Sequence, residues 1–252
     1  MIRLLALLAS AAAVAATQPG PAAATFTYLG QSTFVMATST GLKILIDPQT
    51  MTKNEPVGGV DVVTVSHEHP DHNAVQLATG SPTVVRGLVE GELAKVDQTV
   101  KGVRIRTVGT FHDPQQGGQR GKNAVFVFEL PGLKVVHLGD LGHTLDAQQI
   151  AAIGPADVLL IPVSGGPTID PKTAVEVITQ LSAKVVIPMH YGMAKPAGGA
   201  AGGGGRGFSL GTVDEFLKAL DASTKVVQEG HSLALSAGKL PAGRTVMVMK
   251  TE

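Results

Sequence analysis

The sequence has no cysteine among its 252 residues, and this absence limits both its stabilisation and its chemistry. A chain without thiols forms no disulfide bonds, so its stability must come from a hydrophobic core, which 44% hydrophobic residues at this length can supply. Any zinc-type metal site must then use histidine and carboxylate ligands. We also expect no lipoprotein anchor, since that anchor is attached to a cysteine.

The sequence also lacks an excess of charge of either sign. Twenty basic residues balance twenty acidic residues, and no Lys/Arg-rich block occurs. Such blocks are the electrostatic footprint of proteins that bind nucleic acid. We therefore expect no nucleic-acid partner and, if the protein is an enzyme, a small-molecule substrate.

Long hydrophobic runs are missing as well. The apolar stretch 4–16 is shorter than the ~20 residues of a membrane-spanning helix. It follows Arg3 and precedes a region of small residues, as in a secretory signal peptide. We expect residues 1–24 to be a signal peptide and linker, cleaved between Ala16 and Thr25, and the mature protein to be periplasmic or secreted without a membrane anchor.

The remaining residues, 25–252, predict a single domain that begins with strands and continues with strands and helices. Strands are predicted at 25–29, 33–37, 43–47, 60–65, 84–85, 103–108, 123–129, 133–138, 158–163, 185–188, 225–228 and 232–235. Helices are predicted at 86–96, 148–153, 171–181 and 214–220. The first four strands resemble an antiparallel sheet, and Pro131-Gly132 predicts a hairpin. Together these elements favour an α/β (α+β) fold with two sheets face to face and helices outside.

The segment 66–72, Ser-His-Glu-His-Pro-Asp-His, concentrates three imidazoles and two carboxylates directly after an apolar strand. His67 and His69 are two residues apart and project from one face if the strand continues. Asp71 and His72 fall in the turn beyond it, where they can bind a second ion. The alternative is a polar turn that caps a helix starting near Asn73, but a cap needs one such group rather than five.

Three further candidate ligands follow predicted strands later in the chain. They are His112, Asp140 and His190. Polar side chains at the ends of strands of one sheet tend to meet at one rim, where active sites are commonly found. Taken alone, a histidine or aspartate after a strand is more often a turn residue, or a residue that supports a ligand, than a ligand itself.

The segment His67-Glu68-His69-Pro70-Asp71-His72 resembles the HxHxDH signature of the metallo-β-lactamase fold superfamily. The segments 111–123, 137–143 and 187–191 are similar to its group of zinc-dependent hydrolases related to L-ascorbate-6-phosphate lactonase. The resemblance covers nearly all of the chain from Thr25 onward. It implies a four-layer αββα sandwich, built from two mixed sheets, and a metal-dependent hydrolase.

Carried over to this sequence, the resemblance implies two divalent ions with Asp140 as the bridge. The first ion would be held by His67, His69 and His112, and the second by Asp71, His72 and His190. Zinc is the expected metal, with manganese or iron as alternatives. Two such ions can share a water, lower its pKa and present hydroxide to a small ester, lactone or phosphoester, with Asp71 as the catalytic residue that orients it.

Other polar residues receive weaker assignments. His143 is a candidate proton donor to the leaving group, or else a supporting residue on the same turn. Asp47, Glu68 and Asp113 are candidate acceptors for ligand imidazoles. Arg120, Lys122 and Asn123 either bind an anionic substrate group or form a solvated loop, while His137 is expected to be a core residue and His231 receives no role. The glycine-rich segment 197–207 predicts a flexible surface loop or a substrate lid.

Three alternative functions remain open at this point. The first is a phosphodiesterase or nuclease of the same fold, against which the neutral charge argues. The second is a non-catalytic metal-binding scaffold, which has no need of an open site for two ions. The third is a single-iron oxygen-using enzyme, because ligand identity does not name the metal.

Overall fold

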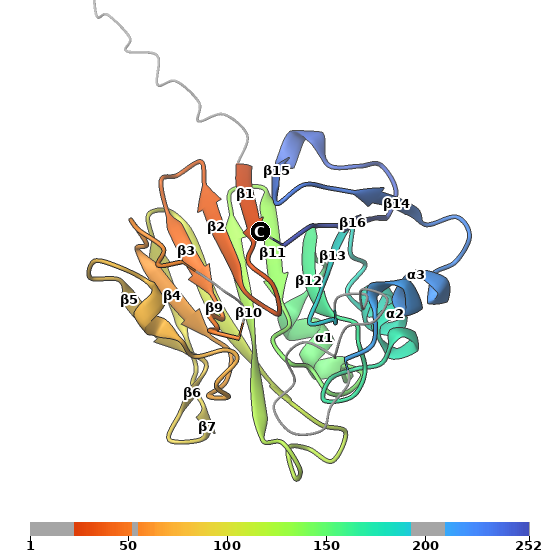
Figure 1. Cartoon of the computed structure of the whole chain (residues 1–252), viewed down its shortest axis with the longest axis horizontal. Coiled ribbons are helices and arrows are strands. Elements are labelled where there is room, and N and C mark those ends of the chain that lie inside the picture. The colour runs from red at the N-terminus through yellow and green to blue at the C-terminus, as the bar shows by residue number, and fades with distance from the viewer. Residues whose placement is uncertain (1–22, 52–54, 193–209, 252) are drawn as a thin grey trace, which may run out of the picture.

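Two β-sheets packed face to face form the framework of the computed structural model, which describes residues 23–51, 55–192 and 210–251 (Figure 1). The six-stranded sheet contains, in spatial order, β15 (Ser232–Ser236), β1 (Ala23–Tyr28), β2 (Phe34–Thr38), β3 (Lys43–Ile46), β4 (Val62–Val65) and β5 (Thr83–Arg86). The eight-stranded sheet contains β14 (Lys225–Gln228), β16 (Thr245–Val248), β13 (Val185–Met189), β12 (Val158–Pro162), β11 (Leu133–His137), β10 (Lys122–Leu130), β9 (Val103–Phe111) and β8 (Asp97–Val100). The predicted α/β fold with two packed sheets is confirmed.

Both sheets are mixed. In the smaller sheet β1, β2 and β3 pair antiparallel, whereas β3, β4 and β5 pair parallel. The fourth predicted strand, β4, therefore does not continue the antiparallel pattern. It runs in the same direction as β3, and such parallel neighbours need a long crossover connection, which here joins Ile46 to Val62. In the larger sheet β8 to β11 are antiparallel, and the pairs from β11 through β12, β13 and β16 to β14 are parallel. The predicted hairpin is confirmed, with Leu130 opposite Leu133.

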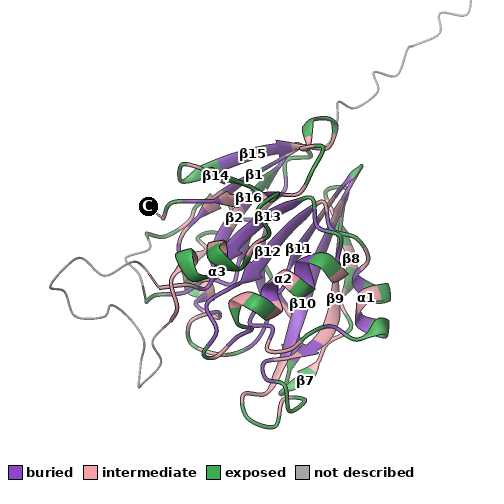
Figure 2. Ribbon diagram, turned by 90° about the vertical axis from the view of Figure 1, so that its right-hand side faces the viewer, coloured by how far each residue is buried: buried purple, intermediate pink, exposed green. Residues whose placement is uncertain are grey.

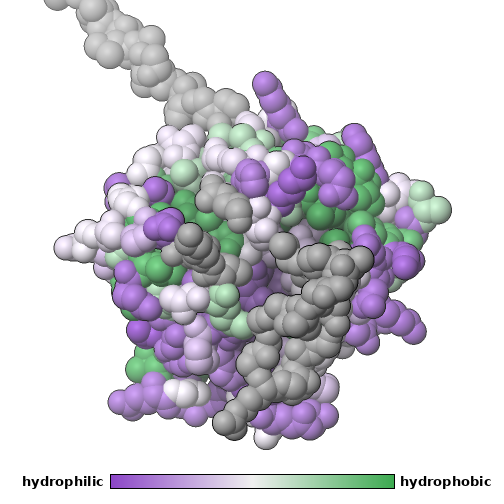
Figure 3. All heavy atoms as spheres, viewed as in Figure 1, coloured by the Kyte–Doolittle hydropathy of each residue, from purple (hydrophilic) through white to green (hydrophobic). Residues whose placement is uncertain are grey.

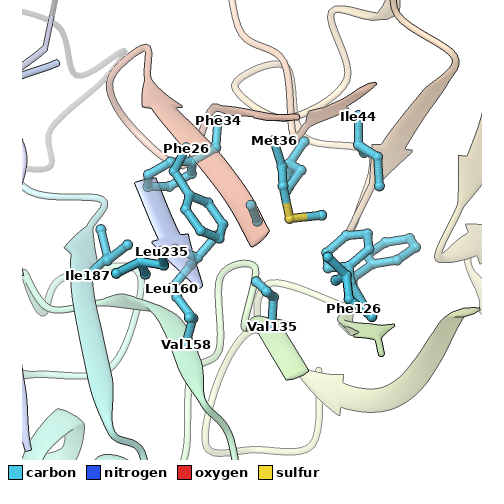
Figure 4. Packing of buried hydrophobic residues seen from close by; sticks show 14 of the residues in the cluster. Phe26, Phe34, Met36, Ile44, Phe126, Val135, Val158, Leu160, Ile187 and Leu235 are labelled. Carbon is cyan, nitrogen blue, oxygen red and sulfur yellow. The ribbon is translucent and has the colours of Figure 1, made fainter. Parts of the chain in front are cut away.

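The main hydrophobic core lies between the two sheets. Alternate residues of β1, namely Ala24, Phe26 and Tyr28, are buried, as the period of a strand requires. Figure 4 shows side chains of β1, β2 and β3 facing those of β10 to β13. β10 is buried along almost its whole length because it is covered on both faces.

A second core lies between the eight-stranded sheet and the helices α1 (Ala147–Ile153), α2 (Pro171–Gln180) and α3 (Val213–Ala219), which cover its outer face (Figure 2). Each of the first two begins where the sequence provides a cap. Asp146 and Gln149 form a capping box at α1, and Asp170 accepts from the backbone of α2 just before Pro171. These helices lie within a residue or so of their predicted ends.

The outer face of the six-stranded sheet is covered differently. A third cluster, with Leu45, Val60, Val63 and Val65 buried, packs against loop residues and the 3₁₀ turn η1 (Val75–Leu77). A helix that starts near Asn73 was the alternative to a metal site. In the structure this segment forms only the short 3₁₀ turn η1. A second 3₁₀ turn, η2 (Ala237–Lys239), follows β15.

The helix predicted at 86–96 is wrong. Its residues form the end of β5 and a hairpin of β6 (Leu88–Val89) and β7 (Glu92–Leu93). Glu90 and Gly91 between them both have positive φ, at 52° and 80°, which suits a two-residue hairpin turn. A side chain at Gly87 would meet Cβ of Ala124 at 2.3 Å, so this segment needs close backbone contact rather than helical spacing.

β1 begins at Ala23, two residues before the predicted domain boundary at residue 25. The predicted signal peptide, apart from Ala23 and Ala24, and the glycine-rich segment 197–207 lie outside the described residues. No helix in the described ranges is both long and apolar enough to cross a membrane. On the face shown in Figure 3, hydrophilic residues dominate the lower half, and hydrophobic ones gather higher up in two areas, one on the left and one on the right over β14 to β16.

Candidate metal centre

The predicted ligands lie at one rim of the two sheets, and the strands that precede His112, Asp140 and His190 run in the same direction. Residues 66–72 follow β4, His112 follows β9, Asp140 follows β11 by three residues, and His190 follows β13. β9 and β11 are both antiparallel to β10, and β11, β12 and β13 are parallel. The carboxyl ends of these strands therefore bring together residues from distant parts of the sequence.

All seven predicted ligands meet at this rim in two groups. Ligand atoms of His67, His69 and His112 lie within 4.8 Å of one another. The same holds for Asp71, His72, Asp140 and His190. This grouping matches the two ligand sets that the resemblance implied.

Asp140 lies between the two groups. Its Oδ2 is 3.1 Å from Nε2 of His112 in the first group and 3.2 Å from Nε2 of His190 in the second. Its Oδ1 is 3.2 Å from Nε2 of His72. One carboxylate is thus within reach of both groups, as a bridging ligand has to be.

The donor set fits divalent metal ions. Asp140 Oδ1 and His72 Nε2 are buried and lack a hydrogen-bond partner among the described residues, although they face each other. Nε2 of His67 lies only 3.0 Å from Nδ1 of His69, so two ring nitrogens converge on the same space. Imidazole nitrogens and carboxylate oxygens arranged in this way are typical ligands of zinc and related ions.

The charge states of His67 and Asp140 suit metal binding, whereas His72 has to release a proton to bind metal. Burial acts to lower the pKa of His72, but the carboxylates of Asp140 and Asp47 outweigh it and raise that pKa well above its usual value. Burial, reinforced by the neighbouring His72 and His112, lowers the pKa of His67 well below its usual value and keeps that imidazole neutral. Burial acts to raise the pKa of the Asp140 carboxyl, but the surrounding imidazoles of His190 and His72 outweigh it and hold the pKa well below its usual range. Neutral imidazole and ionised carboxylate are the forms that bind metal.

Asp47 supports both groups from behind, as predicted. It follows β3 and is fully buried, with a positive φ of 43°. His72 Nδ1 lies 2.8 Å from Asp47 Oδ2, and Ser66 donates to the same carboxylate through its N–H and its hydroxyl. Since Ser66 Oγ is also 3.0 Å from Nδ1 of His67, one carboxylate orients a histidine of each group. Asp47, His67 and His72 also form a cluster of potential ligands, but Asp47 already pairs with Nδ1 of His72.

The other two predicted acceptors have different roles. Glu68 forms an exposed ion pair with Arg86 and accepts from Asn73. Asp113 accepts four backbone N–H groups of the loop that follows it, so its carboxylate shapes the connection from β9 to β10. Neither bonds a ligand imidazole, because each carboxylate points to a nearer donor.

Asn123 differs from both predictions made for it. It is fully buried, donates to Thr110 Oγ1 and to the carbonyl of Leu138, and accepts from the N–H of Asp140. It therefore fixes the backbone at Asp140 and has no surface for a substrate. Lys122 pairs with Glu92 at the surface, and Arg120 is partly exposed.

His143 and His137 are both held by main-chain groups. His143 Nδ1 lies 2.6 Å from the carbonyl of Thr144, and its Nε2 accepts from the N–H of Phe111, which leaves no free N–H for a leaving group. The geometry thus favours the supporting role over the catalytic one. His137, fully buried, pairs with Ser32 O and accepts from Gly139 N, so its prediction as a core residue is confirmed. His231 is exposed.

Sequence reasoning missed Ser66, the positioning role of Asn123, and Gln31. Gln31, in the turn after β1, donates from Nε2 to Asp71 Oδ2 at 3.1 Å. All three were detectable in part, since each is a polar residue at a strand end or strand start on the same rim as the ligands.

Comparison with known proteins agrees with this geometry. The sequence model of one protein family, described as the beta-lactamase superfamily domain, matches residues 25–190 of this chain. A UPF0173 metal-dependent hydrolase of Pyrobaculum islandicum is 32% identical over 190 residues, covering 65% of this chain and 82% of the relative.

Solved structures show the same relationship. A Thermotoga maritima protein, described as a Zn-dependent hydrolase of the metallo-beta-lactamase superfamily, aligns with TM-score 0.68 and 39% identity over 91% of this chain and 100% of its own. A Parabacteroides distasonis protein, described as a metal-dependent hydrolase, aligns with TM-score 0.60 and 18% identity over 91% of this chain and 94% of its own, which shows the shared fold. The chain therefore belongs to the metallo-β-lactamase superfamily of metal-dependent hydrolases.

Proposed function

We propose that this protein is a hydrolase that uses two divalent metal ions to cleave a small ester, lactone or phosphoester. The observation that carries the proposal is the position of Asp140, within 3.2 Å of histidines from both ligand groups. His67, His69 and His112 would hold one ion, and Asp71, His72 and His190 the other, with Asp140 shared. We expect zinc, with manganese or iron as alternatives, and the Thermotoga maritima relative described as Zn-dependent supports this order.

When bound, two such ions supply a water of lowered pKa as nucleophile and stabilise negative charge on the reacting group. The protein's own residues would orient the reactants. Asp71 is the acidic group open to substrate. Its side chain is 24% exposed, whereas that of the other carboxylate ligand, Asp140, is 3% exposed. It would accept a hydrogen bond from the attacking water and take its proton. No serine or cysteine nucleophile is required.

The lactonase-type resemblance favours a small, partly anionic substrate over a polymer. Balanced charge supports the same choice, because a nucleic-acid substrate needs a basic surface. The signal-peptide pattern at residues 1–24 supports export, with the substrate met in the periplasm or outside the cell.

The test is a turnover screen of lactones, phosphodiesters, phosphomonoesters, thioesters and β-lactams with zinc- and manganese-loaded protein. Metal analysis should give two equivalents per chain. His112→Ala and Asp140→Ala should each reduce turnover to background, whereas His231→Ala, at an exposed histidine outside the site, should match the wild type. Wild-type rates in either of the first two variants would refute the assignment.

A further inference from the structure

The turn between β1 and β2 reaches the ligand rim through Gln31. Its side-chain Nε2 donates to Asp71 Oδ2 at 3.1 Å, and its main-chain oxygen accepts from the N–H of His190 at 2.8 Å. The hydroxyl of Tyr28, itself fully buried, donates to the same main-chain oxygen at 2.9 Å. One residue thus contacts two ligands of the same group by two separate hydrogen bonds.

Asp71 depends on this contact more than the other ligands of its group do. Its side chain is 24% exposed, whereas those of His72, Asp140 and His190 are at most 3% exposed and packed in place. Among the hydrogen bonds of the described residues, the Gln31 amide is the donor that the Asp71 carboxylate accepts. Without it, a partly solvated carboxylate is free to change rotamer.

Gln31 and His190 are both held in an unfavourable backbone conformation. Their φ angles are 56° and 54°, in the left-handed region that residues with a side chain rarely adopt. Such conformations persist where the surrounding structure enforces them, and they concentrate at functional sites. Here the hydrogen bond from His190 N–H to Gln31 O joins the two strained residues to each other.

We propose that Gln31 is a positioning residue for the second metal ion, holding Asp71 by its amide and His190 by its main chain. The inference rests on the proposed two-ion function and adds a residue outside the ligand set. It predicts that loss of the amide lowers the affinity for the ion bound by Asp71, His72 and His190. The affinity for the ion of the three-histidine group should not change. Loss of such a supporting partner typically costs 10–100-fold in metal affinity.

The experiment is a titration of the metal-free full chain with cobalt, in which binding is monitored by visible absorption and by calorimetry. Gln31→Met keeps the length of the side chain and removes the donor. We expect the first equivalent to bind as in wild type and the second about 10–100-fold more weakly. The kcat and KM of turnover are compared in parallel, because a misplaced Asp71 changes kcat more than KM.

Two further variants separate positioning from folding. Gln31→Gly also removes the amide but relieves the positive φ, so the metal-free protein should melt no lower than wild type while the second equivalent still weakens. Gln180→Met removes an amide that bonds Leu145 rather than a predicted ligand, and both equivalents should bind normally.

The outcomes distinguish this inference from the proposed function. If the wild type and both Gln31 variants all bind two equivalents of cobalt with the same high affinity, the role of Gln31 is overturned but the two-ion function is not. Equal weakening of both equivalents would also overturn it, because that result indicates a general structural defect. Fewer than two equivalents in wild type would overturn the two-ion function, and with it this inference.

Discussion

Nδ1 of His72 lies 2.8 Å from Oδ2 of Asp47, and neither side chain is accessible to solvent. The same carboxylate accepts from Ser66, whose hydroxyl is within hydrogen-bond distance of His67. One buried aspartate therefore orients a histidine from each of the two ligand groups. This arrangement makes both groups sensitive to a single residue outside the predicted ligand set.

Replacing Asp47 with alanine should destabilise the protein and weaken metal binding together. The change leaves a buried imidazole and the Ser66 donors without their acceptor, for which we expect a loss of about 3–5 kcal/mol in the free energy of unfolding. Denaturant unfolding of the metal-free protein and cobalt titration measure the two effects. Asp170→Ala, which removes the cap of α2, should cost only about 1 kcal/mol and leave metal affinity unchanged.

Gly139 should not tolerate alanine. Its φ is 55°, and a Cβ there would lie 2.3 Å from Asn123 Oδ1 and 2.8 Å from Ser66 Cβ. Because Asn123 holds the backbone of Asp140, the clash displaces the proposed bridging ligand as well. Gly41→Ala is the matched control, since its φ is 79° and no atom lies within 4 Å of its Cβ. Gly41→Ala should cost about 1 kcal/mol and Gly139→Ala about 1–3 kcal/mol more, as measured by denaturant unfolding.

Removal of metal should lower the stability of the folded protein. An ion that binds the native state alone adds about 2.7 kcal/mol when its free concentration is 100 times its dissociation constant. A chelator should therefore lower the melting temperature, and added zinc should restore it. In Asp140→Ala the same chelator should change the melting temperature much less, and an undiminished shift would argue that the stabilising ion binds elsewhere.

Asp61 should contribute stability that is lost in acid. Its carboxylate accepts from Lys101 Nζ and from the backbone N–H of Lys43, and these contacts, the first being the larger, hold its pKa below its usual value. A carboxyl whose pKa is lower in the folded state stabilises the protein above its unfolded pKa of about 4, and this contribution disappears as the pH falls through the folded value.

We therefore expect Asp61→Asn to be destabilised by about 0.5–1 kcal/mol at pH 7, since the ion pair is partly exposed. The difference from wild type should shrink below pH 4. Urea unfolding at a series of pH values from 3 to 7 measures it. A difference independent of pH would show that packing rather than ionisation accounts for the effect.

Much of the fold was predictable because its signals are local. The hairpin at Pro131-Gly132 and the capped helices α1 and α2 depend on residues within a few positions of one another. The helix predicted at 86–96 was wrong for the opposite reason, because contacts between distant residues matter there. Its apolar residues are spaced ambiguously, and the close approach of Gly87 to Ala124, a residue far along the chain, leaves no room for a side chain at position 87.

The candidate site divides in the same way. The concentration of histidine and aspartate at 67–72 identified metal chemistry without a structure. Glu68, Asp113 and Asn123 could not be assigned correctly, because the partner of each side chain depends on which donors the neighbouring strands and loops place nearest to it. For Asn123 these are Thr110, Leu138 and Asp140.

The sequence by itself determined the kinds of ligand available, through the absence of cysteine and the spacing of His67, His69, Asp71 and His72, since these are properties of short segments. Only the tertiary structure decided that Ser66, Asn123 and Gln31 hold the residues of these groups in place, and it brought Asp140 and Asp47 to the positions that the resemblance implied. Those relationships depend on the directions and pairing of strands far apart in the chain, and the free energy that fixes them comes from the shared core between the sheets.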